Sequence, residues 1–180
     1  MKVQSFLKSA VALAVVAGAS VTAQAATYNL GVLTVGGPPT SFNAFHAGFA
    51  LSQFDDDFTF SLVTDGFTAG SVLDFSIPGI VGAQFASANL YSGMPGTGTL
   101  IAQAVGTTSS MSFTNVFTPA GTYYLAVAGN VTGGVSLGAA YSGSINVSPI
   151  PEPESYAMLL AGLGVMGAIA ARRNKAKKQS

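Results

Sequence analysis

The chain of 180 residues contains no cysteine, no tryptophan and a single histidine, His46. Without cysteine the protein has no thiolate nucleophile, no cysteine-ligated metal site and no disulfide. His46 lies between aromatic residues in "FNAFHAGFA", which is typical of a loop or partly buried imidazole rather than a catalytic base. We therefore predict that the protein is not an enzyme. Because a glycosidase needs only two carboxylates, that reaction is the remaining enzymatic alternative.

Lysine and arginine are absent from Ser9 to Ala171. Residues 26–150 contain five aspartates and no basic residue, so the formal charge of this segment is −5. Proteins that bind nucleic acids use Lys and Arg to contact the phosphates. The charge distribution therefore excludes nucleic acid as a partner of this segment. It also places every cation at one of the two ends of the chain.

The N-terminal end has the three parts of a secretory signal. Lys2 and Lys8 form a basic region, "AVALAVVAGASV" is apolar, and Ala23 and Ala25 are the small residues that a signal peptidase accepts. We predict a signal peptide over residues 1–25, helical in the precursor, with signal peptidase cutting after Ala25; cleavage after Ala26 is the alternative.

The C-terminal end combines an apolar segment with a basic tail. Tyr156 to Ala171 is a stretch of 16 uncharged residues, followed by five cations within 172–178. At about 1.5 Å rise per residue the stretch spans about 24 Å, which is short for a hydrocarbon layer of about 30 Å. We predict a transmembrane helix over 156–171, with Arg172 and Arg173 as the cytoplasmic membrane stop. The rest of the chain would then be exported through the inner membrane.

The tail "PEPESYAMLLAGLGVMGAIAARRNKAKK" resembles a PEP-CTERM sorting signal. The matching parts are the triplet Pro151, Glu152 and Pro153, the short apolar segment and the basic stop, so that residues 151–180 form the signal. The resemblance implies that an exosortase recognises and processes the tail, in bacteria that make exopolysaccharide. The two prolines fix φ and favour an extended strip that presents Glu152. The competing interpretation is a permanent membrane anchor.

The middle segment, residues 26–150, shows the pattern of an all-β protein. Short alternating stretches recur between glycine, proline and asparagine residues, which favours an antiparallel β-sandwich or jelly roll. In "DFTFSLV" the alternation puts Phe58, Phe60 and Leu62 on one face. In "TYYLAVAG" it puts Tyr123 and Val127 on the inward face together with Leu125.

The stretch "FDDDFTF" carries a second resemblance. Phe54, Asp56 and Phe58 match the FxDxF pattern of a group of PEP-CTERM proteins. The stretches "DDFTFSL", "ANLYSG" and "PAGTYYLAVAG" also resemble a pre-peptidase C-terminal domain, which is a β-sandwich module of secreted bacterial proteins. The resemblance to the pre-peptidase C-terminal domain implies a β-sandwich, which is the fold that the alternation of hydrophobic residues also predicts.

The aspartate triplet has two interpretations. Asp55, Asp56 and Asp57 are candidate ligands for Ca²⁺, which takes six to eight oxygen ligands. Alternation, however, sends Asp56 to the opposite face from its neighbours. The competing interpretation is that Asp56 caps the start of a strand by accepting backbone N–H bonds, and it is favoured because no EF-hand or RTX spacing accompanies the acids.

These observations predict an exported, non-enzymatic protein of the cell surface or the extracellular matrix, processed by signal peptidase and an exosortase. We expect it to contact the inner membrane transiently and to associate with exopolysaccharide in a biofilm. No cofactor is predicted. The alternative is an adhesive module that binds Ca²⁺ or carbohydrate, with Tyr and Phe rings stacking on sugars.

Overall fold

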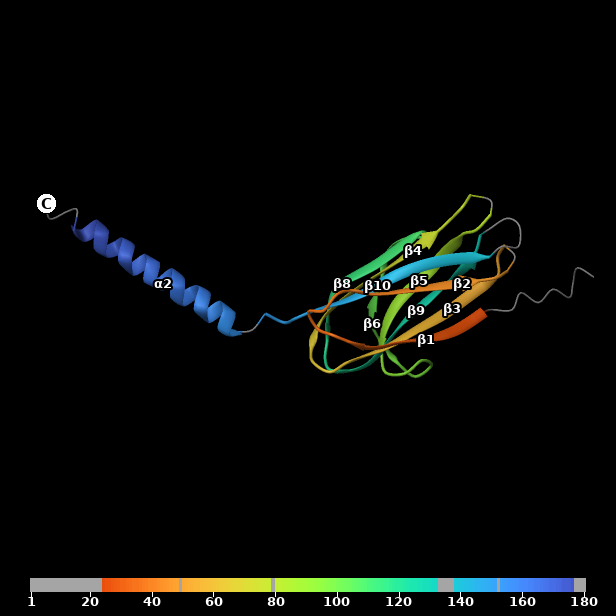
Figure 1. The fold of residues 1–180 in the computed structure, drawn as a ribbon, viewed down its shortest axis with the longest axis horizontal. Coiled ribbons are helices and arrows are strands. Elements are labelled where there is room, and N and C mark those ends of the chain that lie inside the picture. Colours follow the sequence, from red (N-terminus) through yellow and green to blue (C-terminus); the bar gives the residue numbers. More distant parts are fainter. Residues whose placement is uncertain (1–23, 49, 79, 133–137, 152, 177–180) are drawn as a thin grey trace, which may run out of the picture. The chain divides into compact units, whose positions relative to one another are not determined.

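The computed structural model describes residues 24–48, 50–78, 80–132, 138–151 and 153–176 (Figure 1). The chain divides after Ser148 into a β unit and a C-terminal unit. Of the predicted signal peptide, residues 1–23 lie outside the described residues. The predicted signal helix therefore lies there as well, and Gln24 and Ala25 are the only signal residues described.

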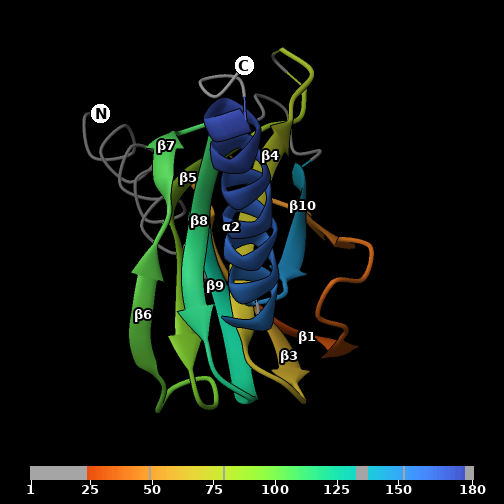
Figure 2. The ribbon, with the colours of Figure 1, turned by 90° about the vertical axis from the view of Figure 1, so that its left-hand side faces the viewer.

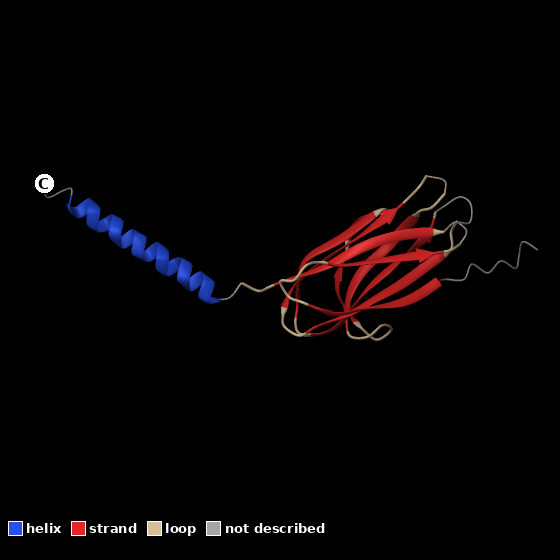
Figure 3. Cartoon of the chain, in the orientation of Figure 1, coloured by secondary structure: helices blue, strands red, loops and turns tan. Residues whose placement is uncertain are grey.

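The β unit is built from strands throughout, as Figure 3 shows by colour. The strands are β1 (Gln24–Leu33), β2 (Thr40–His46), β3 (Gln53–Leu62), β4 (Gly66–Phe75), β5 (Ala83–Ser92), β6 (Thr99–Gln103), β7 (Val105–Thr107), β8 (Ser110–Thr118), β9 (Gly121–Val131) and β10 (Ala139–Ser148). The predicted all-β class is thus confirmed for the described part of the unit.

The strands form two five-stranded sheets. The first sheet has the order β1-β3-β9-β5-β6 and the second has the order β2-β10-β4-β8-β7. The chain crosses between the two sheets several times. One of these crossings lies between β6 and β7, which follow one another in Figure 2. The predicted antiparallel pairing holds for the other strand pairs of the described unit, while β1 pairs with β3 in parallel at one edge. The reason is topological: β1 and β3 lie in the same sheet, and the chain visits β2 in the other sheet between them.

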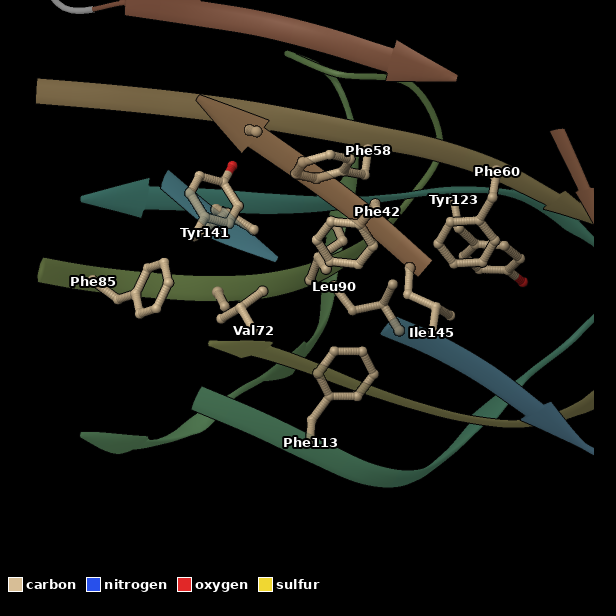
Figure 4. Close-up of a cluster of buried hydrophobic side chains, with 14 of the residues drawn as sticks. Phe42, Phe58, Phe60, Val72, Phe85, Leu90, Phe113, Tyr123, Tyr141 and Ile145 are labelled. Carbon is tan, nitrogen blue, oxygen red and sulfur yellow. The ribbon is translucent and has the colours of Figure 1, made fainter. Parts of the chain in front are cut away.

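The core lies between the inner faces of the two sheets. Figure 4 shows Phe42, Phe58, Val72, Phe113 and Tyr141 packed together between the strands. The inner face of β3 follows the predicted alternation, with every second residue from Phe54 to Leu62 buried. Tyr123, Leu125 and Val127 of β9 are buried as predicted. The hydrophobic period of two therefore identified the inner faces correctly.

The C-terminal unit contains one described helix, α2 (Pro153–Ala176). The predicted non-helical strip ends at Pro151, which lies outside the helix, and the prediction is wrong for Pro153, which begins the helix. Proline suits this first helical position, because its fixed φ is helical and its missing N–H would have no partner there. Glu154 in the first turn complements the positive end of the helix dipole.

None of the described helical segments combines the length and the hydropathy that a membrane crossing requires. The segment 156–171 is helical as part of α2, and its crossing of the membrane stays a prediction.

Candidate functional site

The FxDxF residues Phe54, Asp56 and Phe58 all point into the core from β3. Their exposed fractions are 1%, 0% and 0%. Two buried aromatic rings on either side of a fully buried aspartate are unusual, because an isolated carboxylate is costly to remove from water. The aspartate must therefore find polar partners inside the sandwich.

Asp56 meets two polar side chains from the opposite sheet. His46, the last residue of β2, donates from Nε2 to Asp56 Oδ2 at 2.6 Å. The hydroxyl of Tyr141 in β10 donates to the same oxygen. His46 and Tyr141 are 4% and 2% exposed. Together with Gln24, these residues form what we call the buried polar cluster.

The second ring nitrogen of His46 also faces an oxygen. Nδ1 lies 3.3 Å from Gln24 Oε1, and the amide of Gln24 is oriented because its Nε2 donates to the carbonyl of Ala47. Both ring nitrogens of His46 therefore face oxygen atoms. The imidazole ring and the Asp56 carboxylate form a buried pair across the two sheets.

The pair is enclosed by aromatic rings. The His46 ring stacks on Phe54 with centroids 4.8 Å apart, and Phe54 in turn stacks on Tyr141 at 5.4 Å. Burial raises the pKa of Tyr141 far above its ordinary value of 10, and the hydrogen bond to Asp56 raises this pKa further. Tyr141 therefore stays protonated and continues to donate its hydrogen bond.

This geometry overturns the strand-cap interpretation of Asp56. The residue lies within β3, not at its start, and its hydrogen-bond partners are side chains of the other sheet. Within the described part of the chain, the other carboxylate oxygen, Oδ1, has no hydrogen-bond partner. The cluster cross-links the two sheets from inside the core.

Gln24 belongs both to this cluster and to the predicted cleavage motif. In β1, Gln24 is in register with Phe54 and Ala25 with Asp55. Cleavage after Ala25 would remove both residues and with them the oxygen that faces His46 Nδ1. Cleavage after Ala23 would keep the strand and the cluster whole.

We expect a β unit that begins at Gln24 to be more stable than one that begins at Ala26, by about 1–3 kcal/mol. The longer form keeps two hydrogen bonds of the Gln24 side chain, each worth about 0.5–1.5 kcal/mol. Urea unfolding of both forms, ending at Ile150, measures the difference. A Gln24→Ala variant of the longer form separates the side chain from the strand ladder. Equal midpoints for all three would contradict the assigned role of Gln24.

Asp55 and Asp57 lie on the outer face of β3, opposite to Asp56, as the alternation predicts. They line a hollow of about 350 Å³ with Tyr91, Tyr124 and residues of the β5–β6 loop. Burial raises the pKa of Asp57, and the negative charges of Asp55 and Asp56 add to this effect. Among the described residues, no group of three or more His, Asp or Glu side chains could hold a metal ion. The predicted Ca²⁺ ligands Asp55, Asp56 and Asp57 thus do not converge.

A second, larger hollow of about 680 Å³ lies on the same outer face. Its lining includes Thr27 and Asn29 of β1, Thr59 of β3, and Met94 and Pro95 of the loop after β5. We call the two hollows together the outer-face trough. Sequence reasoning missed it, because most of its residues are neutral and they come from several separate segments.

The pattern G-x-S-x-G occurs once, as "GVSLG" at residues 134–138. Sequence reasoning overlooked it. It lies between β9 and β10, whereas a nucleophile elbow joins a strand to a helix. Ser136 lies outside the described residues, and so does Glu152 of the sorting triplet.

The C-terminal residues match a known family of sorting signals. Residues 149–174 match the PEP-CTERM protein-sorting motif. The match covers the triplet Pro151 to Pro153, most of α2 and the stop residues Arg172 and Arg173. The motif indicates an exported protein that is sorted by an exosortase. The finer assignment to an FxDxF group stays a prediction.

The chain is similar to several solved structures, while no curated protein sequence matches it. The chain is similar to the pre-peptidase C-terminal domain of a collagenase from Bacillus anthracis, with 17% identity, 67% of this chain and 94% of that chain covered, and a TM-score of 0.41. It is also similar to PliG of Aeromonas hydrophila, a periplasmic inhibitor of g-type lysozyme, with 15% identity, 70% and 99% covered, and a TM-score of 0.38.

Proposed function

We propose that this chain is an exported, non-enzymatic protein of the cell surface or extracellular matrix that associates with exopolysaccharide. Signal peptidase removes its leader, and an exosortase processes its tail from a membrane-anchored precursor. The match of residues 149–174 to the PEP-CTERM sorting motif carries this proposal. The position of Pro153 at the first turn of α2 supports it, because the triplet then joins an extended linker to the sorting helix.

The non-enzymatic part is supported by the buried polar cluster. His46 is 4% exposed and Asp56 is 0% exposed, so this histidine–carboxylate pair does not face solvent in the described structure. The hydrogen bond between His46 and Asp56 instead joins the two sheets. Between Gln24 and Ser148 the sequence also holds no Lys or Arg that could stabilise a developing anion.

The sorting step is tested by replacing Pro151, Glu152 and Pro153 with alanine in a host that contains the exosortase. We expect the variant to accumulate in the inner-membrane fraction and its release to fall at least tenfold, because the processing enzyme loses its recognition triplet. Fractionation with immunoblotting measures the distribution.

The matched control replaces Pro38 and Pro39, which are exposed between β1 and β2, with alanine. This change removes as many prolines as the triplet variant but leaves the sorting motif intact, and we expect nearly normal release. If the triplet variant were released as efficiently as the natural protein, the sorting proposal would be wrong.

A further inference from the structure

We propose that the outer-face trough of the first sheet is a binding site for an uncharged polysaccharide chain. This inference rests on the proposed function and names the surface and the ligand class through which it would act. The trough lies on the face that points away from the core, so the core is not disturbed by binding.

A row of polar and aromatic side chains crosses the face. Asn29 is in register with Thr59, Thr59 with Tyr124, and Tyr124 with Tyr91, on the adjacent strands β1, β3, β9 and β5. With strands about 4.8 Å apart, the row extends about 14 Å, which is the length of a short oligosaccharide. Amide and hydroxyl groups both donate and accept hydrogen bonds, as the hydroxyl groups of a sugar do.

The row lines both hollows, with Asn29 and Thr59 in the larger one and Tyr124 and Tyr91 in the smaller one. Their volumes, about 680 and 350 Å³, fall in the range of about 300–1,000 Å³ that ligand pockets occupy. Met94 and Pro95 give the larger hollow an apolar wall, against which the C–H face of a pyranose ring can pack. Strands β3 and β9 contribute residues to both hollows, so one extended chain can contact both.

The smaller hollow has a rigid aromatic side. Tyr91 and Tyr124 stack with centroids 4.9 Å apart and an interplanar angle of 6°. The β5–β6 loop closes over Tyr124, and a Cβ atom at Gly98 would lie only 2.5 Å from the Tyr124 ring. Tyr124 is only 6% exposed, so Tyr91 is the ring of the stack that a ligand can reach. Because Tyr91 is held in place before binding, little side-chain entropy is lost when a ligand contacts it.

The charge of the trough selects the ligand class. Asp55 and Asp57 face the smaller hollow, and the sequence from Gln24 to Ser148 provides no Lys or Arg to offset them. An anionic polysaccharide would be repelled at this site. The hydroxyl groups of an uncharged chain can instead donate to the two carboxylates, and such charge-assisted hydrogen bonds are about twice as strong as neutral ones.

Affinity gel electrophoresis of the exported protein tests the site. The gels contain dextran, laminarin or hydroxyethyl cellulose as uncharged chains, chitosan as a cationic chain and alginate as an anionic chain, each with Ca²⁺ and with chelator. We expect at least one uncharged polysaccharide to retard the protein, with the same retardation in chelator, and no retardation by alginate.

Two variants locate the site and one controls for their general effects. Thr122→Arg fills the larger hollow from an exposed strand position, and Tyr91→Ala removes half of the ring stack. Thr114→Arg makes the same exchange at an exposed position of β8 in the other sheet. We expect the first two variants to lose at least tenfold in affinity and Thr114→Arg to bind like the natural protein.

Several outcomes would overturn the inference. If Thr122→Arg binds like Thr114→Arg, the polysaccharide binds elsewhere and the proposed function stands without this site. Retardation by chitosan alone that disappears at high salt would show a simple charge attraction. Retardation that requires Ca²⁺ would show a metal-dependent site instead.

If none of the uncharged polysaccharides retards the protein, the inference is wrong. The proposed function is tested separately, by the sorting assay. If Tyr91→Ala does not fold, Thr122→Arg decides alone.

Discussion

Replacing Asp56 with alanine is expected to lower the free energy of unfolding by about 2–6 kcal/mol, because two buried hydrogen-bonding groups lose their partner at a cost of about 1–3 kcal/mol each. The variant leaves the His46 ring and the Tyr141 hydroxyl without the carboxylate oxygen that they share. Because stabilities of small domains are about 5–15 kcal/mol, this loss threatens folding at moderate temperature. Chemical denaturation of the β unit measures the change.

Asp55→Ala is the matched control for this experiment. It removes the same group from the preceding residue, which lies on the outer face of β3 and is exposed. Surface substitutions away from special features usually change stability by about 0.5 kcal/mol or less. If the two variants had equal stability, Asp56 would not be the residue that cross-links the sheets.

Tyr141 should make the protein sensitive to alkaline pH. Burial raises the pKa of the folded-state hydroxyl above the ordinary value of 10 that the unfolded chain shows. The folded state therefore holds the proton more tightly, so its stabilising effect is complete below pH 10 and is lost as the pH rises above it. While only the unfolded tyrosine titrates, the loss is about 1.4 kcal/mol per pH unit.

The Tyr141→Phe variant isolates this contribution. At neutral pH it should be less stable than the natural protein by about 1–3 kcal/mol, because Asp56 loses a buried donor. Above pH 10 its free energy of unfolding should fall less steeply, by about 1.4 kcal/mol per pH unit. Tyr28, Tyr123 and Tyr124 also have raised pKa values from burial, so they affect both curves alike. Parallel curves would contradict the role of Tyr141.

Much of the fold could be predicted from local patterns. Alternation in β3 correctly assigned Phe58, Phe60 and Leu62 to the core and separated Asp56 from its neighbours. Such a pattern is readable because successive side chains of a strand point to opposite faces. The parallel pairing of β1 with β3 could not be read in this way, because pairing depends on the order in which the chain visits the two sheets.

In the candidate sites, too, the contacts depend on strand packing and could not be predicted from the local sequence. Nothing near His46 in the sequence indicates that its partners are Asp56, ten residues away, and Gln24, 22 residues away. The trough was equally hidden, since Asn29, Thr59, Tyr124 and Tyr91 become neighbours only through the strand register. Neutral residues of this kind leave no charge or spacing signal.

The amino-acid sequence alone determined the basic ends, the lysine-free and arginine-free middle, the β alternation and the sorting tail, because each is a property of adjacent residues. Tertiary structure alone decided that Asp56 joins two sheets, that Gln24 belongs to the folded β unit and that a trough crosses the first sheet. These features are made by side chains far apart along the chain, and only the packing of the strands brings them within contact distance.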